Sequence, residues 1–560
     1  MLALRNRAIR VRRALICAVV VAGGAGAVGL AGSLGSVGCS TPSAGGGTGN
    51  QNPAGGPIVI GASIGLTGSL DGNAPAMQGG LLAAVQQVNA LGGILGRTVT
   101  ITTQDDTSDP NQALTVAKSL FKSGASVLIG PIGSEQVSTI QPFIQMSKFV
   151  NVSATATSTQ LTGMYPSSGG YFFRTVPSDS AQALAVGIFA LSGPSPDAGG
   201  AGCRTMDVVH NNDSYGNPLA TSIERYFTAN GGVIPAMGDF PVPENAQGDY
   251  DSQVTQVLKD LPDCLVLAVY PPTAAQFMQN LSQALHPSPP TGWSKSFFVI
   301  GTDGTYDPSL ITDGLANPSD PKSMSWVNGT YGPPMYGTVA LTNDHNRQQY
   351  NDLASIYVAE VGLSSGSKDL DPYTSNEYDA AILTLLAMQA AGTTTDGAAI
   401  QKAMFNVSRG KTQNATPYGP AQLADAIAAI NKGADINYEG ASGNVDFDDY
   451  GNVIGDFLVW EVQGSGFANY NQITSTQLAA AQATEDAGVK TTHDAGSPKD
   501  SGAKDAHSDA AHDAGHDATT AHDAAIEAAS HDAETALEGG SDAMRDALSA
   551  DGAIHDGASQ

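Results

Sequence analysis

The sequence predicts an α/β fold in which parallel βαβ units form two similar lobes. Short apolar runs alternate with helical patterns from about 57 to 472, which is typical of parallel sheets covered by helices. The pattern restarts near 177, after roughly 120 residues, and a segment of that length is an ordinary domain. With 560 residues the chain is long enough for two or three domains, each with its own core.

Five strands and three helices are expected in the first lobe. The strands are expected at 58–60, 98–102, 126–129, 149–152 and 171–175. The helices are expected at 75–90, 110–123 and 134–146. Gly92 and Gly93 end the first of these helices, and Asp109 followed by Pro110 supplies an N-cap and a first-turn proline for the second.

The second lobe is expected to open with a helix at 180–191. Strands are expected next at 205–209, 233–240, 265–270 and 296–300. Helical stretches at 343–361, 374–391 and 398–405 then indicate a return to the first lobe. A hairpin over 443–462 closes the body, and the Ala/Asp/His-rich composition that begins near 474 predicts disorder.

These boundaries divide the chain into seven expected segments. They are an export signal at 1–39, a flexible tether at 40–56, the first lobe at 57–176, the second lobe at 177–326, a return to the first lobe at 327–453, a return to the second lobe at 454–472, and a disordered acidic tail at 473–560. The chain is therefore expected to cross between the lobes three times.

The N-terminus has the pattern of an export signal, because five arginines precede an apolar Gly/Ala-rich stretch from 14 to about 34. This stretch ends at Cys39, in a sequence that resembles a bacterial lipobox, although Ser36 stands where a lipobox has leucine. We expect a periplasmic lipoprotein anchored to the membrane through Cys39. Plain cleavage and an uncleaved anchor remain alternatives.

Export places the remaining cysteines, Cys203 and Cys264, in an oxidising compartment. Each precedes an apolar strand, and the two strands are neighbours if they are the first and third of a doubly wound unit. We therefore expect a disulfide, with two free thiols as the alternative. The net charge of −28 argues against nucleic acid or an anionic membrane surface as a partner.

Polar side chains that suit an amino acid come directly after three of the expected strands. Ser134 begins a helix, and Thr155 and Thr157 come after the next strand, so these residues offer neutral donors to a carboxylate. Asp303 comes after the strand at 296–300 and suits an ammonium group. Ligands of open α/β sheets bind beyond the carboxyl ends of the strands, so these groups predict one site for a zwitterion.

Several motifs in combination resemble the leucine/isoleucine/valine-binding protein family. They include Leu66-Thr67-Gly68, Gly92-Gly93-Ile94-Leu95-Gly96-Arg97, Asp105-Asp106 with Asp109-Pro110, Gly130-Pro131 with Ser134, and Phe173-Arg174-Thr175. The resemblance covers about 57–464. It implies two Rossmann-like lobes joined by three hinge crossovers, the type I periplasmic binding protein fold, and a role in capturing solutes for an ABC permease in the inner membrane.

The resemblance also implies roles for individual residues. The carboxylate-binding serine falls on Ser134, the strand-end pair on Thr155 and Thr157, and the ammonium-binding acid on Asp303. The aromatic wall of the pocket falls on Tyr215, Tyr270 and Tyr373. Asn73 stands where branched-chain binders carry a bulky aromatic residue, which leaves the ligand open among small amino acids and related amides.

Two other functions remain open at this point. One is a ligand-sensing receptor module that signals through a partner. The other is a serine hydrolase, because Gly61-Ala62-Ser63-Ile64-Gly65 fits the nucleophile-elbow pattern, with Asp303 and His345 as further candidates for a triad. We expect a binding protein that is no enzyme and that needs no cofactor and no metal ion.

Overall fold

The computed structural model describes most of the body of the chain. The described residues are 55–162, 170–194, 202–243, 250–286, 288–294, 296–313, 326, 332–342, 344–361, 370, 373–464 and 466–494. The chain divides into two compact units, 1–487 and 488–560, and both lobes belong to the first unit. The expected export signal, Cys39 and most of the tether lie outside the described residues.

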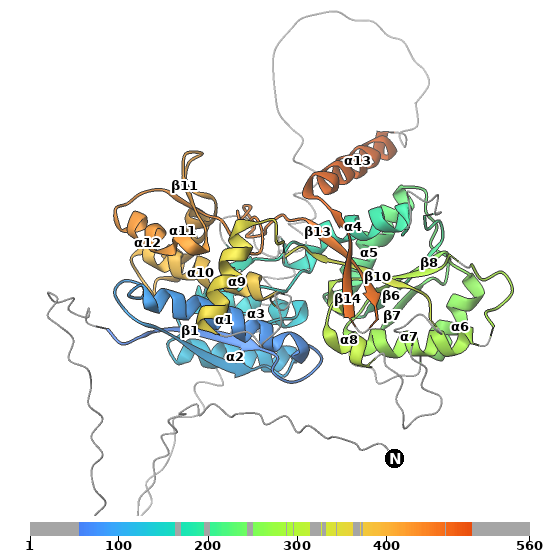
Figure 1. The fold of residues 1–560 in the computed structure, drawn as a ribbon, viewed down its shortest axis with the longest axis horizontal. Helices are drawn as coiled ribbons and strands as arrows, with labels where there is room; N and C mark the ends of the chain where they lie inside the picture. Colours follow the sequence, from blue (N-terminus) through green and yellow to red (C-terminus); the bar gives the residue numbers. More distant parts are fainter. Residues whose placement is uncertain are drawn as a thin grey trace, which may run out of the picture. The chain divides into compact units, whose positions relative to one another are not determined.

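The first lobe is built on a parallel sheet with the strand order β2-β1-β3-β4-β5 (Figure 1). Its strands are β1 (Ile58–Ile64), β2 (Val99–Asp105), β3 (Val127–Ile129), β4 (Asn151–Ser153) and β5 (Phe172–Arg174). The connecting helices are α1 (Ala74–Ala90), α2 (Pro110–Lys122) and α3 (Ser134–Ser147). Asp109 caps α2 by accepting a hydrogen bond from the backbone N–H of Gln112, as the Asp-Pro pair predicted.

A later part of the chain completes the first lobe. It contributes the helices α9 (Gln348–Glu360), α10 (Thr374–Ala391), α11 (Gly397–Arg409) and α12 (Leu423–Asn431), and the two short strands β11 (Thr416–Tyr418) and β12 (Ile436–Tyr438). Helix α10 packs against α1, although the two lie far apart in sequence, and Figure 1 shows the gold segment beside the blue one. Nearly every residue of α10 is buried, so this helix forms the centre of the lobe.

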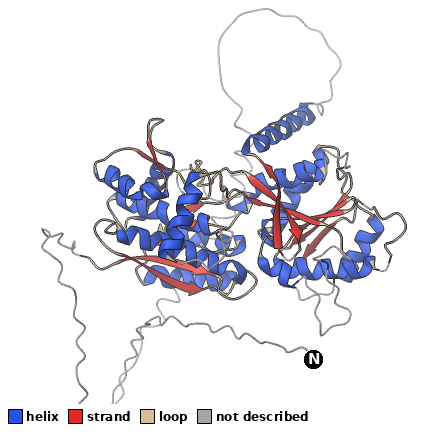
Figure 2. Cartoon of the chain, viewed as in Figure 1, coloured by secondary structure: helices blue, strands red, loops and turns tan. Residues whose placement is uncertain are grey.

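The second lobe has a larger sheet with the strand order β14-β13-β10-β9-β8-β6-β7. Its strands are β6 (Met206–Asn211), β7 (Asp239–Val242), β8 (Cys264–Ala268), β9 (Phe298–Gly301), β10 (Met335–Ala340), β13 (Phe457–Gln463) and β14 (Gly466–Ile473). Its helices are α4 (Asp179–Ser192), α5 (Gly216–Ala229), α6 (Asp251–Asp260), α7 (Pro271–Leu285) and α8 (Pro308–Asp313). Helices border the strands of this sheet (Figure 2), and β6, β8 and β9 are wholly buried, as expected of central parallel strands.

The chain crosses between the two lobes at three places that lie side by side. The first crossover comes after β5, the second comes after β10 and the third precedes β13. Pro177 forms a bridge with Val453, and the backbone N–H of Leu341 donates to the carbonyl of Asp456 over 2.8 Å. The third crossover therefore contacts both of the others and joins them into one hinge.

The boundary expected at 326/327 between the second lobe and the return to the first is wrong. Strand β10 pairs with β9 in parallel and with β13 in antiparallel orientation, so it belongs to the second sheet. The chain leaves the second lobe only after Ala340. Local pattern could not show this, because long-range pairing decides which sheet a strand joins.

Three other expectations need correction. The strand expected at 233–240 is confined to Asp239–Val242, and Val233 contributes only an isolated bridge to Thr205. The closing hairpin lies one element later than expected, since β13 pairs with β14 around Gly464. The expected disorder of 473–560 is wrong for Ser475–Asp494, which forms the helix α13. The rest of that tail lies outside the described residues.

A disulfide joins Cys203 and Cys264, whose Cα atoms are 5.7 Å apart. Strands β6 and β8 are direct neighbours, with Met206 opposite Cys264. Strand pairing therefore brings the two cysteines together at one end of the second sheet, in the way that the doubly wound strand order predicts. Both cysteines are buried.

Candidate ligand-binding site

A cavity lies between the two lobes at the carboxyl ends of the parallel strands, next to the hinge. The first lobe contributes Ser69, Leu70, Asn73, Ile132, Gly133, Ser134, Thr155, Thr157 and Tyr373 to its lining. The second lobe contributes Tyr215, Tyr270, Pro271, Asp303, Gly304 and Asp307. All seven residues that sequence reasoning assigned to ligand binding are therefore brought together around one cavity. Asn73 lines it too.

The first lobe presents the start of a helix and a hydroxyl group to the cavity. Ser134 is the first residue of α3, where free backbone N–H groups and the positive end of the helix dipole favour an anion. Its hydroxyl oxygen accepts a hydrogen bond from the backbone N–H of Ser158 over 3.2 Å. The Ser134 proton therefore remains available for a carboxylate.

The two threonines differ in what their hydroxyl groups do. Thr155 donates its proton to the carbonyl of Ile132 over 2.8 Å, so it is the poorer donor to a ligand. Thr157 is almost fully buried, and its carbonyl accepts hydrogen bonds from the backbone of Asp179 and the side chain of Arg174. At this strand end the Thr155 hydroxyl is therefore already engaged, whereas Thr157 is held in place through its backbone carbonyl.

The second lobe presents a carboxylate held by a tyrosine. Asp303 begins a 3-10 turn (Asp303–Thr305) directly after β9. Its Oδ1 accepts a hydrogen bond of 2.7 Å from the Tyr215 hydroxyl and one of 2.9 Å from the backbone N–H of Gly304. Burial raises the pKa of Asp303, and the hydrogen bond from Tyr215 opposes that rise.

Two aromatic rings stack on each other beside this carboxylate. The rings of Tyr215 and Tyr270 lie 5.4 Å apart with an angle of 16° between their planes. Both rings line the cavity, and the Tyr215 hydroxyl is occupied by Asp303 and by Thr302 at 2.7 Å. Both tyrosines are nearly fully buried.

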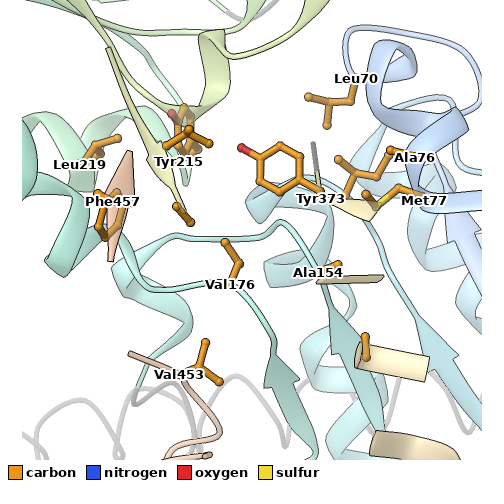
Figure 3. Packing of buried hydrophobic residues seen from close by; sticks show 14 of the residues in the cluster. Leu70, Ala76, Met77, Ala154, Val176, Tyr215, Leu219, Tyr373, Val453 and Phe457 are labelled. Atoms are coloured by element: carbon orange, nitrogen blue, oxygen red, sulfur yellow. The ribbon is translucent and has the colours of Figure 1, made fainter. Parts of the chain in front are cut away.

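Tyr373 connects the lobes across the cavity. It lies immediately before α10 in the left-handed region, with a φ of 66°, which is costly for an aromatic residue. Its hydroxyl donates to the backbone carbonyl of Asp303 over 3.4 Å. In Figure 3 the Tyr373 oxygen points toward the side of Tyr215, while Leu70 and Met77 lie on the other side of the ring. Tyr373 therefore links the first lobe to the second.

The mouth of the cavity also depends on close contact between the lobes. Gly72 lies in a 3-10 turn (Asp71–Asn73) of the first lobe, opposite Asp307 of the second. A Cβ atom at Gly72 would lie 2.3 Å from the Asp307 carboxylate, closer than any stable contact. Glycine at this position therefore allows the lobes to approach each other.

The described residues that line the cavity include two aspartates, Asp303 and Asp307, and no lysine, arginine or histidine. Burying a carboxylate is costly unless hydrogen bonds or a cation stabilise it, and a cation beside Asp303 would do so. The cavity thus has a side rich in donors on the first lobe and an acidic side on the second. This arrangement suits a small molecule with an anionic and a cationic end.

Sequence reasoning did not single out Asp179 and Asp307, and it used Arg174 only as part of a family motif. Asp307 caps the short helix α8 through the backbone N–H of Ser309, and a residue before Pro308 reads locally as no more than a cap. Asp179 starts α4 and has the same local pattern. The sequence feature that could identify Asp179 is its position directly after the first crossover.

The structure does not assemble the proposed hydrolase site. Ser63 lies inside β1, not at a strand-to-helix turn, and it is fully buried. Its hydroxyl donates to Asp106 over 2.7 Å. Neither Ser63 nor His345 is among the described residues that line the cavity with Asp303. The nucleophile-elbow interpretation of this motif is therefore wrong.

The comparisons with known proteins agree with this geometry. A family model described as periplasmic binding protein matches residues 57–434. The chain belongs to that family. The match spans both lobes, and the family implies an extracytoplasmic location. Among the described residues, none of the helices is long and apolar enough to cross a membrane.

Two named relatives match this chain over most of their own length. It is 26% identical over 420 residues to the chemotactic signal transduction system substrate-binding protein BasB of Halobacterium salinarum, covering 74% of this chain and 89% of that protein. It is 22% identical over 347 residues to the Leu/Ile/Val-binding protein BraC3 of Rhizobium johnstonii, covering 62% and 83%. The resemblance to the leucine/isoleucine/valine-binding proteins is thereby confirmed.

The fold is shared with solved structures of such proteins. The leucine-binding protein LivK of Thermotoga maritima superposes with a TM-score of 0.56 at 18% identity, covering 74% of this chain and 99% of that one. The fold is therefore that of type I periplasmic binding proteins, as expected from the sequence.

Proposed function

We propose that this protein captures a small amino acid or a related amide in the cavity between its lobes and delivers it to an ABC permease. The observation that carries the proposal is the division of the cavity lining. Ser134 and the start of α3 offer donors on one lobe, and Asp303 offers a carboxylate on the other. A zwitterion bound between them contacts both lobes at once and so stabilises the closed form.

In this proposal Ser134, Thr155 and Thr157 hold the ligand carboxylate. Asp303 holds the ammonium group, and Tyr215, Tyr270 and Tyr373 enclose the side chain. The protein is exported and attached to the membrane through a lipid on Cys39, with no cofactor. Names of relatives such as the Leu/Ile/Val-binding protein BraC3 support an amino acid as ligand.

A thermal-shift screen with the common amino acids, their amides and aromatic acids tests the proposal. At least one zwitterion should raise the melting temperature, since a ligand that binds only the folded protein stabilises it. Calorimetry with that ligand should show a loss of about tenfold or more for Asp303→Asn, because a charge-assisted contact is removed. Asp425→Asn, at an exposed position of α12, is the control. Absence of any shift, or equal affinity of the Asp303 variant, would contradict the proposal.

A sensing role is the second candidate, and the similarity to the chemotaxis protein BasB favours it. Both roles use the same cavity and differ in the partner that recognises the closed form. Deleting the gene separates them in living cells. Loss of ligand uptake supports transport, whereas intact uptake with lost movement toward the ligand supports sensing.

A further inference from the structure

A second carboxyl group lies behind the cavity, and no hydrogen bond within the described part of the chain satisfies it. Asp179 is the first residue of α4, directly after the first crossover, and its side chain is fully buried. Its backbone N–H donates to the carbonyl of Thr157, a residue of the cavity lining, over 2.8 Å. Neither carboxylate oxygen has a hydrogen-bond partner among the described residues. The Thr157 side chain lies near this carboxyl group and favours its ionised form, which partly opposes the rise in the pKa of Asp179.

The charged and titratable groups around Asp179 come from several elements of both lobes. They are Arg174 of β5, Asp213 and Tyr215 at the start of α5, Asp303 after β9, and Tyr373 before α10. Asp213 is occupied, since its Oδ1 accepts from the backbone N–H groups of Tyr215 and Gly216. Asp303, Tyr215 and Tyr373 all line the cavity.

The charge of Arg174 lowers the pKa of Asp179, but Arg174 donates no hydrogen bond to that carboxylate. Its guanidinium group donates to the carbonyls of Thr157 and Ser158 over 2.8 and 2.9 Å, and to Asn452 over 2.8 Å. None of these partners is a carboxylate. The Arg174 side chain is therefore committed to holding the strand-end loop and the third crossover in place.

Two buried carboxyl groups, Asp179 and Asp303, thus share one region, and no side-chain cation of the described residues pairs with either. Burial is the first cause that raises the pKa of Asp179 well above its usual range, and the Asp303 charge is the second. A carboxyl group in such surroundings retains a proton unless a cation arrives. An ammonium group in the cavity would be that cation.

We propose that Asp179 is a specificity-determining residue which, together with Asp303, selects ligands that carry a protonated amine, and that each bound ligand displaces one proton from this pair. The inference rests on the proposed function. The ligand keeps its own ammonium protons, the O–H bond of one carboxyl group breaks, and that proton passes to the solvent. Asp179 acts through Asp303 and the electrostatic potential of the cavity, and is in this sense a positioning residue.

The exchange makes the preference for an amine depend on pH, which a single carboxylate that is already ionised would not do. An amine supplies the charge that compensates the lost proton, whereas a 2-hydroxy acid of the same shape supplies none. Binding of the hydroxy acid would leave the pair protonated and the ammonium position without a cation. The wild-type protein should therefore prefer an amino acid over its hydroxy analogue most strongly at neutral and alkaline pH.

Calorimetry tests the proton exchange directly. L-leucine and 2-hydroxy-4-methylpentanoate serve as the matched probes, at about pH 6 to 7, in two buffers of low and high ionisation enthalpy. The wild-type protein should release close to one proton per leucine. Its affinity should rise by up to about tenfold per pH unit below the pKa of the pair. Asp179→Asn should abolish the release and reduce the preference for leucine over the hydroxy acid by about tenfold or more.

Asp207 provides a matched control within the same lobe. It is fully buried on β6, neither of its carboxylate oxygens has a hydrogen-bond partner among the described residues, and its pKa is raised to about 8 by burial and then by Asp260. Asp207 does not line the cavity. Asp207→Asn should leave proton release on leucine binding at the wild-type value. If it abolishes the release as well, the effect belongs to buried acids in general and the proposal fails.

A second arm of the test, the pH dependence of the melting temperature, needs no ligand. An acid whose pKa is higher in the folded than in the unfolded protein lowers stability as pH rises from about 4 toward its folded pKa. The melting temperature of Asp179→Asn should therefore fall less steeply with pH than that of the wild type. Identical slopes, or identical leucine enthalpies in both buffers with intact binding, would overturn the inference. If no amino acid binds the wild type, the proposed function fails, and this ligand-free arm alone decides whether Asp179 holds a proton.

Discussion

The Tyr373 hydroxyl donates a hydrogen bond to the backbone carbonyl of Asp303 over 3.4 Å, from one lobe to the other. The same aspartate accepts, through its side chain, a hydrogen bond from Tyr215. One residue of the second lobe is therefore held by a tyrosine of its own lobe and by a tyrosine of the opposite lobe. With Asp303 as the proposed ammonium ligand, binding and closure would be coupled at this point.

Replacement of Tyr373 by phenylalanine should weaken ligand binding by roughly 3- to 10-fold. A typical hydrogen bond contributes about 0.5–1.5 kcal/mol, and this one joins the two lobes, so we expect it to favour closure. Calorimetry with the ligand found by thermal shift measures the effect. Tyr450→Phe, at an exposed position near the third crossover, is the control. Unchanged affinity of the Tyr373 variant would show that the interlobe bond does not favour closure.

Replacement of Gly72 by alanine should hinder closure without unfolding either lobe. The added methyl group would meet the Asp307 carboxylate at 2.3 Å, so either the Asp307 side chain or one of the lobes must move. We expect affinity to fall by roughly 10-fold while the melting temperature of the ligand-free protein changes little. Gly466→Ala is a suitable control, since no atom lies within 4 Å of a Cβ there. Wild-type affinity in the Gly72 variant would contradict the close contact.

Replacement of Glu377 by glutamine should stabilise the protein at alkaline pH. Glu377 is buried on α10, its Oε1 has no hydrogen-bond partner among the described residues, and burial raises its pKa to about 8. Because this folded pKa lies above the unfolded one, the carboxyl group costs stability progressively as pH rises from about 4.5 to 8. The loss amounts to a few kcal/mol, at roughly 1.4 kcal/mol per pKa unit.

Chemical denaturation at several pH values tests this expectation. The free energy of unfolding of Glu377→Gln should decline less between pH 5 and 8 than that of the wild type. Glu360→Gln, at the end of α9, provides an exposed control. Parallel declines in wild type and variant would mean that Glu377 finds a partner on ionisation.

Removal of the disulfide by Cys203→Ala and Cys264→Ala together should lower stability by about 2–4 kcal/mol, since the bond constrains the unfolded chain. The melting temperature should fall correspondingly. A reductant should lower the wild type toward the double variant and leave the variant unchanged. A melting temperature of the wild type that does not respond to complete reduction would contradict a stabilising role.

Much of the fold can be predicted from local signals in the sequence. The cap at Asp109 and the start of α3 at Ser134 lie where the sequence predicts them. The strand ends also predict the cavity lining, because parallel strands deliver their final residues to one edge. Asp303 and Thr157 were found in this way, far apart in sequence and on opposite lobes.

The remainder depends on contacts that no local pattern encodes. Strand β10 joins the second sheet because β9 and β13 pair with it, and neither partner is adjacent in sequence. Asp179 resembles an ordinary first-turn acid until the fold surrounds it with Asp303 and Thr157. Its unusual surroundings arise from tertiary structure, and only the structure reveals them.

The pairing of Pro177 with Val453, and of Leu341 with Asp456, has a consequence for how the molecule could be dissected. Neither half corresponds to one uninterrupted stretch of gene, so truncation cannot isolate either. A protease that cut a single connection would leave the halves tethered by the other two. The two lobes would separate only after all three connections had been cut.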